Sequence, residues 1–378
     1  MPRYVFLLPQ VAAPTGGVAV ALDCADMLGR AGYEVAVLQG SARYRYAFGD
    51  AEVVRLVDPL VPLRIMLATI AAQTGWKARV QWAVSSAGRI LGHLAALPFR
   101  GRSPLRADDV LVVPEIWWAQ AVRLFGRHRQ VLLAQGSHLL LLAWREAVCR
   151  QRLRGDFLAV VATSERCAQT ARALGLAPLE QLPLAVDSER FAFAERKRLA
   201  VAYMPRKRPA EAAVMAELLR RRGKLEGVEL IAIDRMPQDE VARHMRDSLV
   251  FASLPLREGF GLPIAEAMAS GCVVVGYTGQ GAEEFFDDTT GVPIEDSDLL
   301  QLVESVEAVV AEYRRDPARL DALRAAGAQR VRSRYTREAM RAGLLAAWDR
   351  IDSLVEGAGR PLERSVAEEP VGKAKMAS

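Results

Sequence analysis

Asparagine is missing from this sequence of 378 residues, and cysteine is rare, with four residues and no Cys-x-x-Cys pair. Without asparagine the chain contains no N-glycosylation sequon. Scattered cysteines suggest neither a disulfide framework nor a zinc site, and they fit a reducing cytoplasm. No run of about 18 apolar residues occurs, which predicts that nothing spans a membrane. The first apolar run is too short for a signal peptide.

Acidic residues are absent from 59–107, although this segment carries aromatic residues and several cations. The cations are Arg64, Lys77, Arg79, Arg89, Arg100, Arg102 and Arg106. Basic and aromatic residues without acids are typical of helices that lie on an anionic lipid surface. We therefore predict peripheral contact with the inner face of the cytoplasmic membrane. The alternatives are an oligomer surface, or core helices that carry arginine on their solvent-exposed side.

The composition is that of an ordinary globular protein, with 51% hydrophobic residues, 25% charged residues and a net charge of +5. This charge is too small to imply nucleic acid. Residues 3–39 read as strand, glycine turn, helix and strand, the order that begins a doubly wound parallel sheet, and the alternation restarts at Leu199. The chain length suits two such α/β domains. The predicted segments are two Rossmann-like domains at 1–188 and 189–336, a last helix at 337–356 and a disordered tail at 357–378.

One stretch, Ser253–Glu284, combines an apolar strand, a glycine-rich loop and a helix that opens near Pro263. The exposed amides of Gly259 to Leu262 and the helix dipole predict an anion site. Glu266, about one turn into the helix, is placed to accept two hydrogen bonds from a ribose diol. Glu258 precedes the turn. The alternative is an ordinary strand, turn and helix that happens to carry acidic residues.

Three cations, Arg206, Lys207 and Arg208, follow the strand that begins at Leu199, and this placement suits a diphosphate. A basic surface turn is the alternative. The Asp296-Ser297-Asp298 sequence has the D-x-D form of some metal sites, but it directly precedes a helical run and is better explained as an N-cap. We predict no metal and no cofactor.

Polar residues also follow the strands of the first half. The Gly16-Gly17 turn allows a ligand to approach the backbone closely, or is simply a tight turn. Glu115 and Gln135 each end a strand, and His138 lies three residues further on. Because ligands of open parallel sheets bind beyond the carboxyl ends of the strands, these residues are expected at a cleft. A capping role for Glu115 and a helix-start role for His138 remain open.

The pair Glu258 and Glu266, with seven residues between them in EGFGLPIAEAMASGCVVV, resembles the donor-site signature of the retaining nucleotide-sugar glycosyltransferases of family 4, which have the GT-B fold. That resemblance implies two Rossmann-like domains with parallel sheets that face each other across a cleft, and a last helix that returns to the first domain. This sequence departs from the family pattern at Leu184-Ala185, where an Asn-Gly pair is usual. It also departs at Gln135, near which the family often has His.

The resemblance also implies roles for single residues. Glu258 would lie by the donor sugar and phosphates, and Glu266 would bind the nucleotide ribose. Arg206 and Lys207 would hold the diphosphate without metal. The assigned residues are Glu258, Arg206 and Lys207 for catalysis, Gly259, Phe260, Gly261, Leu262, Glu266, Gly16, Gly17 and Gly281 for donor binding, and Glu115, Gln135 and His138 on the acceptor side.

The predicted function is retaining transfer of a sugar from a nucleotide-diphosphate donor to a glycan or lipid-linked acceptor, in surface polysaccharide or glycolipid synthesis. The absence of a glycosidase-type carboxylate pair favours front-face attack over a covalent intermediate. A nucleotide-sugar 2-epimerase is an alternative enzyme. A non-catalytic, membrane-associated assembly partner is an alternative of a different class.

Overall fold

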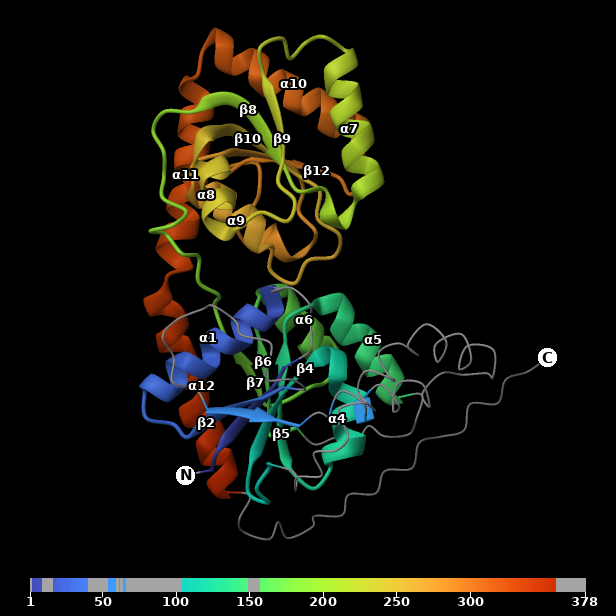
Figure 1. Cartoon of the computed structure of the whole chain (residues 1–378), viewed down its shortest axis with the longest axis vertical. Coiled ribbons are helices and arrows are strands. Elements are labelled where there is room, and N and C mark those ends of the chain that lie inside the picture. The colour runs from blue at the N-terminus through green and yellow to red at the C-terminus, as the bar shows by residue number, and fades with distance from the viewer. Residues whose placement is uncertain are drawn as a thin grey trace, which may run out of the picture.

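The chain forms two α/β domains that lie one above the other, joined by a connection and by the last helix (Figure 1). This computed structural model describes residues 2–8, 16–39, 54–58, 61, 64–65, 104–148 and 157–357. Most of the predicted membrane-contact segment 59–107 and all of the tail from residue 358 lie outside these ranges, so both remain predictions. No helix in the described ranges is long and apolar enough to cross a membrane.

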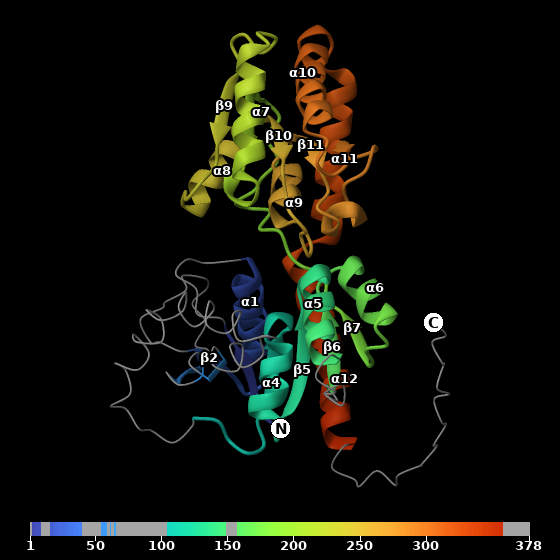
Figure 2. The ribbon, with the colours of Figure 1, turned by 90° about the vertical axis from the view of Figure 1, so that its right-hand side faces the viewer.

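The first domain is built on a seven-stranded sheet, parallel throughout, in the order β3-β2-β1-β4-β5-β6-β7. Its strands are β1 Tyr4–Leu7, β2 Val35–Gln39, β3 Val54–Val57, β4 Val110–Pro114, β5 Arg129–Ala134, β6 Ala159–Ala162 and β7 Leu179–Gln181. Its helices are α1 Gly16–Arg30, η1 Glu115–Trp117, α4 Trp118–Phe125, α5 Ser137–Val148 and α6 Glu165–Ala173. The strands β1, β4 and β6 are buried and apolar along their whole length because helices cover both faces of the sheet (Figure 2).

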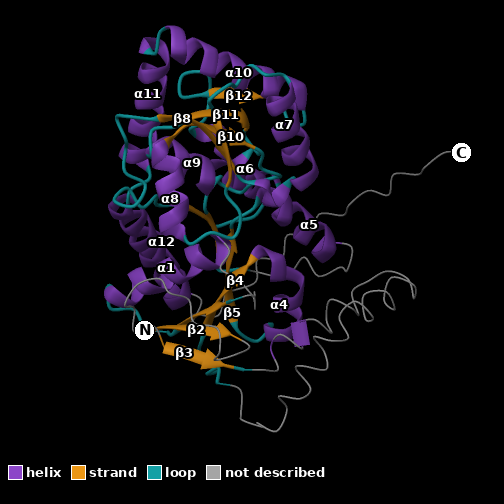
Figure 3. Cartoon of the chain, turned by 45° about the horizontal axis from the view of Figure 1, so that its top comes forward, coloured by secondary structure: helices purple, strands orange, loops and turns teal. Residues whose placement is uncertain are grey.

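The second domain has a smaller sheet of five parallel strands in the order β12-β11-β10-β8-β9. Its strands are β8 Arg198–Tyr203, β9 Glu229–Ala232, β10 Ser248–Ser253, β11 Val273–Tyr277 and β12 Val292–Ile294. Its helices are η2 Pro205–Lys207, α7 Pro209–Arg221, α8 Gln238–Asp247, α9 Leu262–Ala269, η3 Gly281–Glu284, α10 Leu299–Arg315 and α11 Ala318–Arg334. Figure 3 shows both sheets between layers of helices, as an α/β doubly wound architecture requires.

The last helix, α12 Arg337–Gly357, runs from the second domain back along the first, beside α1 (Figure 1). Its Trp348 is fully buried and stacks on Phe6 of β1, with 6.0 Å between ring centroids. The hydroxyl of Tyr33 donates to Asp349 at 2.8 Å, and Tyr4 donates to Asp352. These contacts make α12 part of the first domain's core, so the two domains are tied together at two places in the chain.

Candidate active site

The candidate site lies in the second domain, where β8 and β10 are neighbours and end at the same edge of the sheet. The turn after β8 and the loop after β10 line one pocket there. Its walls include Arg206, Lys207, Glu258 and Gly261, with Met204, Phe251 and Ile264 as the apolar part. The sequence therefore brings two cations, one carboxylate and a helix start together at the place where parallel sheets bind ligands.

Lys207 and Glu258 form an ion pair in this pocket, with 2.5 Å between Nζ and Oε1. The side chain of Lys207 is 34% exposed and that of Glu258 is 17% exposed, so water screens the pair only in part. Arg206 is exposed and lines the same pocket, and its guanidinium has no hydrogen-bond acceptor in the part of the chain that the structure describes. A ligand phosphate can therefore meet one free cation and one that is already held in place.

Arg208, the third cation predicted to be placed for a diphosphate, has a different role. It is buried, donates to the carbonyl oxygen of Pro255 at 2.9 Å, pairs with Asp296 and lies over the ring of Tyr277. The guanidinium group of Arg208 therefore connects the turn after β8 to the loop after β10. The prediction of three ligand-facing cations is therefore wrong for Arg208, because protein groups occupy its side chain.

The acidic pair of the D-x-D sequence is also accounted for by protein contacts. Asp296 accepts from Arg208, and Asp298 caps α10 by accepting the backbone N–H of Gln301 at 2.9 Å. This is the capping arrangement that its position before a helical run predicts.

The start of α9 depends on a glycine. Gly261 is the N-cap residue with φ +97° and ψ +45°, a left-handed conformation that glycine adopts without strain. No side chain caps this helix, and the amides of Gly261 and Leu262 have no hydrogen-bond acceptor within the described ranges. The ring of Phe260 is buried against Phe285 and Tyr335, which anchors the loop from below. The result is a fixed pair of free N–H groups at a helix N-terminus, which suits an anion.

Glu266 lies one turn into α9 and is half-buried. Burial raises the pKa of its carboxyl to about 8, and the nearby positive charge of Arg190 offsets this only in part. Arg190 is held by Gln238 at 2.7 Å and by Asp239 at 2.9 Å. No local pattern marks Arg190, because its position beside Glu266 depends on the connection between the domains.

Glycine residues next to the candidate site allow the two domains to come into close contact. A Cβ atom on Gly259 would lie 1.5 Å from the carbonyl oxygen of Gln135, and one on Gly17 would lie 3.3 Å from the side-chain oxygen of the same residue. A Cβ atom on Gly16 would lie 3.6 Å from Leu262. Gly281 has a supporting role, because a Cβ atom there would meet the backbone of Gly259 at 2.5 Å. The two glycine-rich segments and Gln135 thus form one close contact across the cleft.

Glu115 directly follows β4, near the contact between Gly259 and Gln135, and is 3% exposed. Its carboxylate accepts hydrogen bonds from the backbone N–H groups of Gln135 and Gly136. Burial nevertheless raises its pKa to about 7. The carboxyl group therefore holds the loop that touches Gly259.

Replacing Glu115 by glutamine is expected to change how stability depends on pH. Because the folded-state pKa lies above the unfolded-state value of about 4.3, the folded protein keeps a proton that the unfolded chain has lost. This contribution to stability is present at low pH and is lost as pH rises through 7. Urea unfolding between pH 5 and 8 should show the wild type losing about 2–3 kcal/mol relative to Glu115→Gln. Parallel curves for the two proteins would contradict the raised pKa.

His138 lies on α5 and is not part of the contact around Gly259. Its Nε2 is 2.8 Å from a guanidinium nitrogen of Arg257, which comes from the second domain. A second bridge between the domains is formed by Glu284, which accepts the backbone N–H of Glu165 at 2.8 Å and the hydroxyl of Tyr335 at 3.2 Å. No local pattern marks Arg257, since its partner His138 is 119 positions away.

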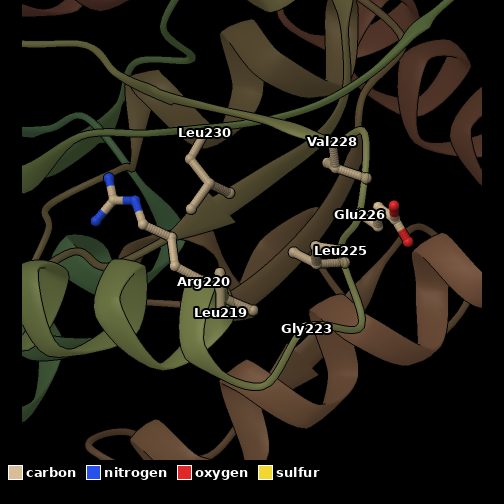
Figure 4. A pocket seen from close by; sticks show the side chains of 7 residues that line it. All are labelled: Leu219, Arg220, Gly223, Leu225, Glu226, Val228 and Leu230. Atoms are coloured by element: carbon tan, nitrogen blue, oxygen red, sulfur yellow. The ribbon is translucent and has the colours of Figure 1, made fainter.

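A further surface pocket lies between the end of α7 and β9, at the far end of the second domain (Figure 4). Leu219, Leu225 and Leu230 line it, and the charged groups of Arg220 and Glu226 lie at opposite sides. It contains none of the predicted site residues. This pocket is therefore not a candidate for the active site.

The fold and the site together define the class. Two parallel α/β domains joined by a cleft contact and a returning last helix form the GT-B fold of glycosyltransferases, as predicted. Residues 206–346, which hold the cations and both glutamates, match a family described as "Glycosyl transferase-like".

Among individual proteins, an alpha-1,6-glucosyltransferase of Actinobacillus pleuropneumoniae serotype 7 (strain AP76) is 34% identical over 101 residues. That match covers 26% of this chain and 31% of the relative, so the chain spans about a third of the relative's length. Two solved structures share the fold. Sucrose-phosphate synthase (tll1590) from Thermosynechococcus elongatus has 13% identity and a TM-score of 0.63, and the comparison covers 93% of this chain and 100% of that one. Anabaena Alr3699/HepE in complex with UDP and glucose has 13% identity, a TM-score of 0.59 and coverages of 92% and 100%.

Proposed function

We propose that this protein is a glycosyltransferase that takes a sugar from a nucleotide-diphosphate donor bound to the second domain. One observation carries the proposal. The Lys207–Glu258 pair lies in one pocket with the free amides at the start of α9, and Glu266 follows one turn into that helix. This arrangement offers positive charge for a diphosphate and a carboxylate for a diol within one short segment.

The transfer step would use these groups to stabilise the leaving nucleoside diphosphate. As the bond between sugar and phosphate breaks, negative charge develops on the phosphate oxygens. Lys207, Arg206 and the amides of Gly261 and Leu262 are positioned to receive that charge before the reaction begins, so little reorganisation is needed. Glu258, held by Lys207, would border the sugar. We propose that no metal takes part.

The finer parts of the proposal come from the sequence resemblance. We propose membership of glycosyltransferase family 4, retention of anomeric configuration and front-face attack. The acceptor would be a glycan or a lipid-linked saccharide in surface polysaccharide or glycolipid synthesis, reached at the cytoplasmic face of the membrane. The neighbour solved with UDP and glucose, and the glucosyltransferase relative, make UDP and glucose the first donor components to test.

Replacing Glu266 by alanine tests the donor site. At pH 9, above the pKa of about 8 of its carboxyl, we expect the Kd of UDP to rise about 10- to 100-fold, because a charged acceptor of two hydrogen bonds from the ribose is lost. The Kd of inorganic pyrophosphate should not change, since pyrophosphate has no ribose. Isothermal titration calorimetry with both ligands measures this difference.

Glu217→Ala is the matched control, because Glu217 is an exposed carboxylate on α7 that pairs only with arginines of its own helix. Equal losses of UDP and pyrophosphate binding in Glu266→Ala would show that the substitution damages the phosphate site instead. Unchanged UDP binding would remove Glu266 from the donor site.

A direct assay of the reaction uses a panel of nucleotide sugars with oligosaccharide and lipid-linked acceptors. The proposal predicts release of nucleoside diphosphate together with a new glycosidic bond in the product. Conversion of the nucleotide sugar to its 2-epimer without any acceptor product would instead identify the epimerase alternative.

A further inference from the structure

A second pocket, of about 490 Å³, lies between the two domains on the other side of the loop that carries Glu258. The first domain contributes three residues of α5, among them His138, and four residues of α6, and the second domain contributes Arg257 and Gln280. The residues from α6 include Arg166, Gln169 and Thr170. The volume is in the range of small-molecule sites. The family resemblance places His138 on the acceptor side, but it implies no anion-binding group at this pocket.

The charge of this pocket is positive. Two arginines line it, and no Asp or Glu is found among the described residues of its wall. Arg166 is half-buried, and its guanidinium has no hydrogen-bond or ion-pair partner within the described residues. Arg257 uses one N–H to reach His138, so four of its five N–H groups remain. Two guanidinium groups from different domains therefore share one cavity with unused donors.

The backbone is adapted to this arrangement. Arg257 has φ +50° and Gln280 has φ +71°, and they are two of the four non-glycine residues with positive φ in the described ranges. Such conformations cost free energy and tend to occur at functional sites. At this turn, two adjacent side chains face different pockets. Glu258 lines the donor pocket with Lys207, whereas Arg257 lines the second pocket.

We propose that this pocket binds an anionic group, a phosphate or a carboxylate, carried by the acceptor. The group would be clamped between Arg166 of the first domain and Arg257 of the second. Gln280, and the amide N–H that Gln169 does not donate to Glu165, are further donors, whereas the hydroxyl of Thr170 already donates to the carbonyl oxygen of Arg166. Guanidinium groups suit both anions because each presents two parallel N–H donors. Since Arg257 directly precedes Glu258, the clamp holds an acceptor next to the donor site and helps to bring the domains together. That the anion belongs to an acceptor rests on the proposed function, whereas the presence of an anion site does not.

The test is calorimetric titration of the UDP-saturated protein with glucose 1-phosphate and, separately, with glucuronate. UDP occupies the cations of the donor pocket, so further anion binding reports the second pocket. We expect at least one of the two probes to bind, and Arg166→Gln and Arg257→Gln each to raise its Kd about tenfold or more. Arg172→Gln, which removes an exposed arginine of α6 that pairs with Glu165 outside the pocket, should leave the Kd unchanged.

The outcomes separate the two proposals. Binding of glucose 1-phosphate alone identifies a phosphate site, binding of glucuronate alone identifies a carboxylate site, and binding of both identifies a general anion site. If neither probe binds, or if both arginine variants bind like the wild type, the inference is wrong. If UDP itself does not bind, the nucleoside diphosphate that does bind takes its place. If none binds, the donor proposal fails, and the same titrations in a Lys207→Ala protein still decide the anion site.

Discussion

Sugar transfer by Lys207→Ala is expected to be about 10²- to 10³-fold slower than by the wild type, as is usual when one preorganised group that stabilises developing charge is removed. Lys207 is half-buried, and its partner Glu258 fixes its position at the pocket. In the variant, Glu258 would remain as a carboxylate without a counter-charge beside the departing phosphate. Both changes raise the barrier, so kcat should fall more than the affinity for the donor. Steady-state kinetics with a saturating nucleotide sugar measure the effect.

Lys224→Ala is the control for this prediction. Lys224 is 59% exposed and forms an ion pair with Glu307, and its neighbours Gly223 and Leu225 line the pocket between α7 and β9, away from the candidate site. Its removal should leave kcat within about twofold, because Lys224 lies outside the candidate site and the buried Glu307 keeps its ion pair with Arg222. A kcat of Lys207→Ala equal to that of the wild type would show that charge at this position does not assist departure of the diphosphate.

Gly259→Ala is expected to lower the transfer rate about 10²-fold, an effect that displacements of about 1 Å at an active site can have. The added Cβ atom would lie 1.5 Å from the carbonyl oxygen of Gln135, which is backbone and cannot rotate away. The domains must therefore separate at this point. The cores of both domains lie elsewhere, so the midpoint of thermal unfolding should change little. Activity assays and thermal unfolding of the same preparation measure both properties.

Gly29→Ala is the matched control, because no atom lies within 4 Å of a Cβ atom at this helical position. It should retain full activity and gain about 0.5–1 kcal/mol of stability from better helix propensity. If Gly259→Ala were as active as Gly29→Ala, close contact between Gly259 and Gln135 would not be needed for the reaction.

The fold could be predicted from the sequence because local patterns determine it. The run that became β1 is apolar throughout, and the run that became β8 is apolar after Arg198, as strands of a doubly covered parallel sheet are, and glycine or proline follows closely at the turns. The segment that holds Glu258, Gly261 and Glu266 is also local, so spacing alone gave the helix start and the carboxylate one turn into it. These features depend on neighbours in the chain, which a sequence shows directly.

The distribution of roles among adjacent residues could not be predicted in the same way. Of three consecutive cations, Arg208 is buried because Asp296, 88 positions away, pairs with it. Arg257 lines the interdomain pocket because His138, 119 positions away, accepts its N–H group. Glu284 reaches Glu165 over an equal separation. The first contact depends on how distant segments of one domain pack together, and the other two depend on how the two domains meet. No local pattern of residue types shows either.

The most direct test of the donor site is calorimetric titration of the wild-type protein and of Lys207→Ala with a panel of nucleoside diphosphates and their sugars. We expect one nucleoside diphosphate to bind the wild type with one site per chain. Lys207→Ala should bind it at least tenfold more weakly. A panel in which no member binds the folded wild-type protein, or binding that is the same in both proteins, would contradict a donor site at Lys207, Glu258 and the start of α9.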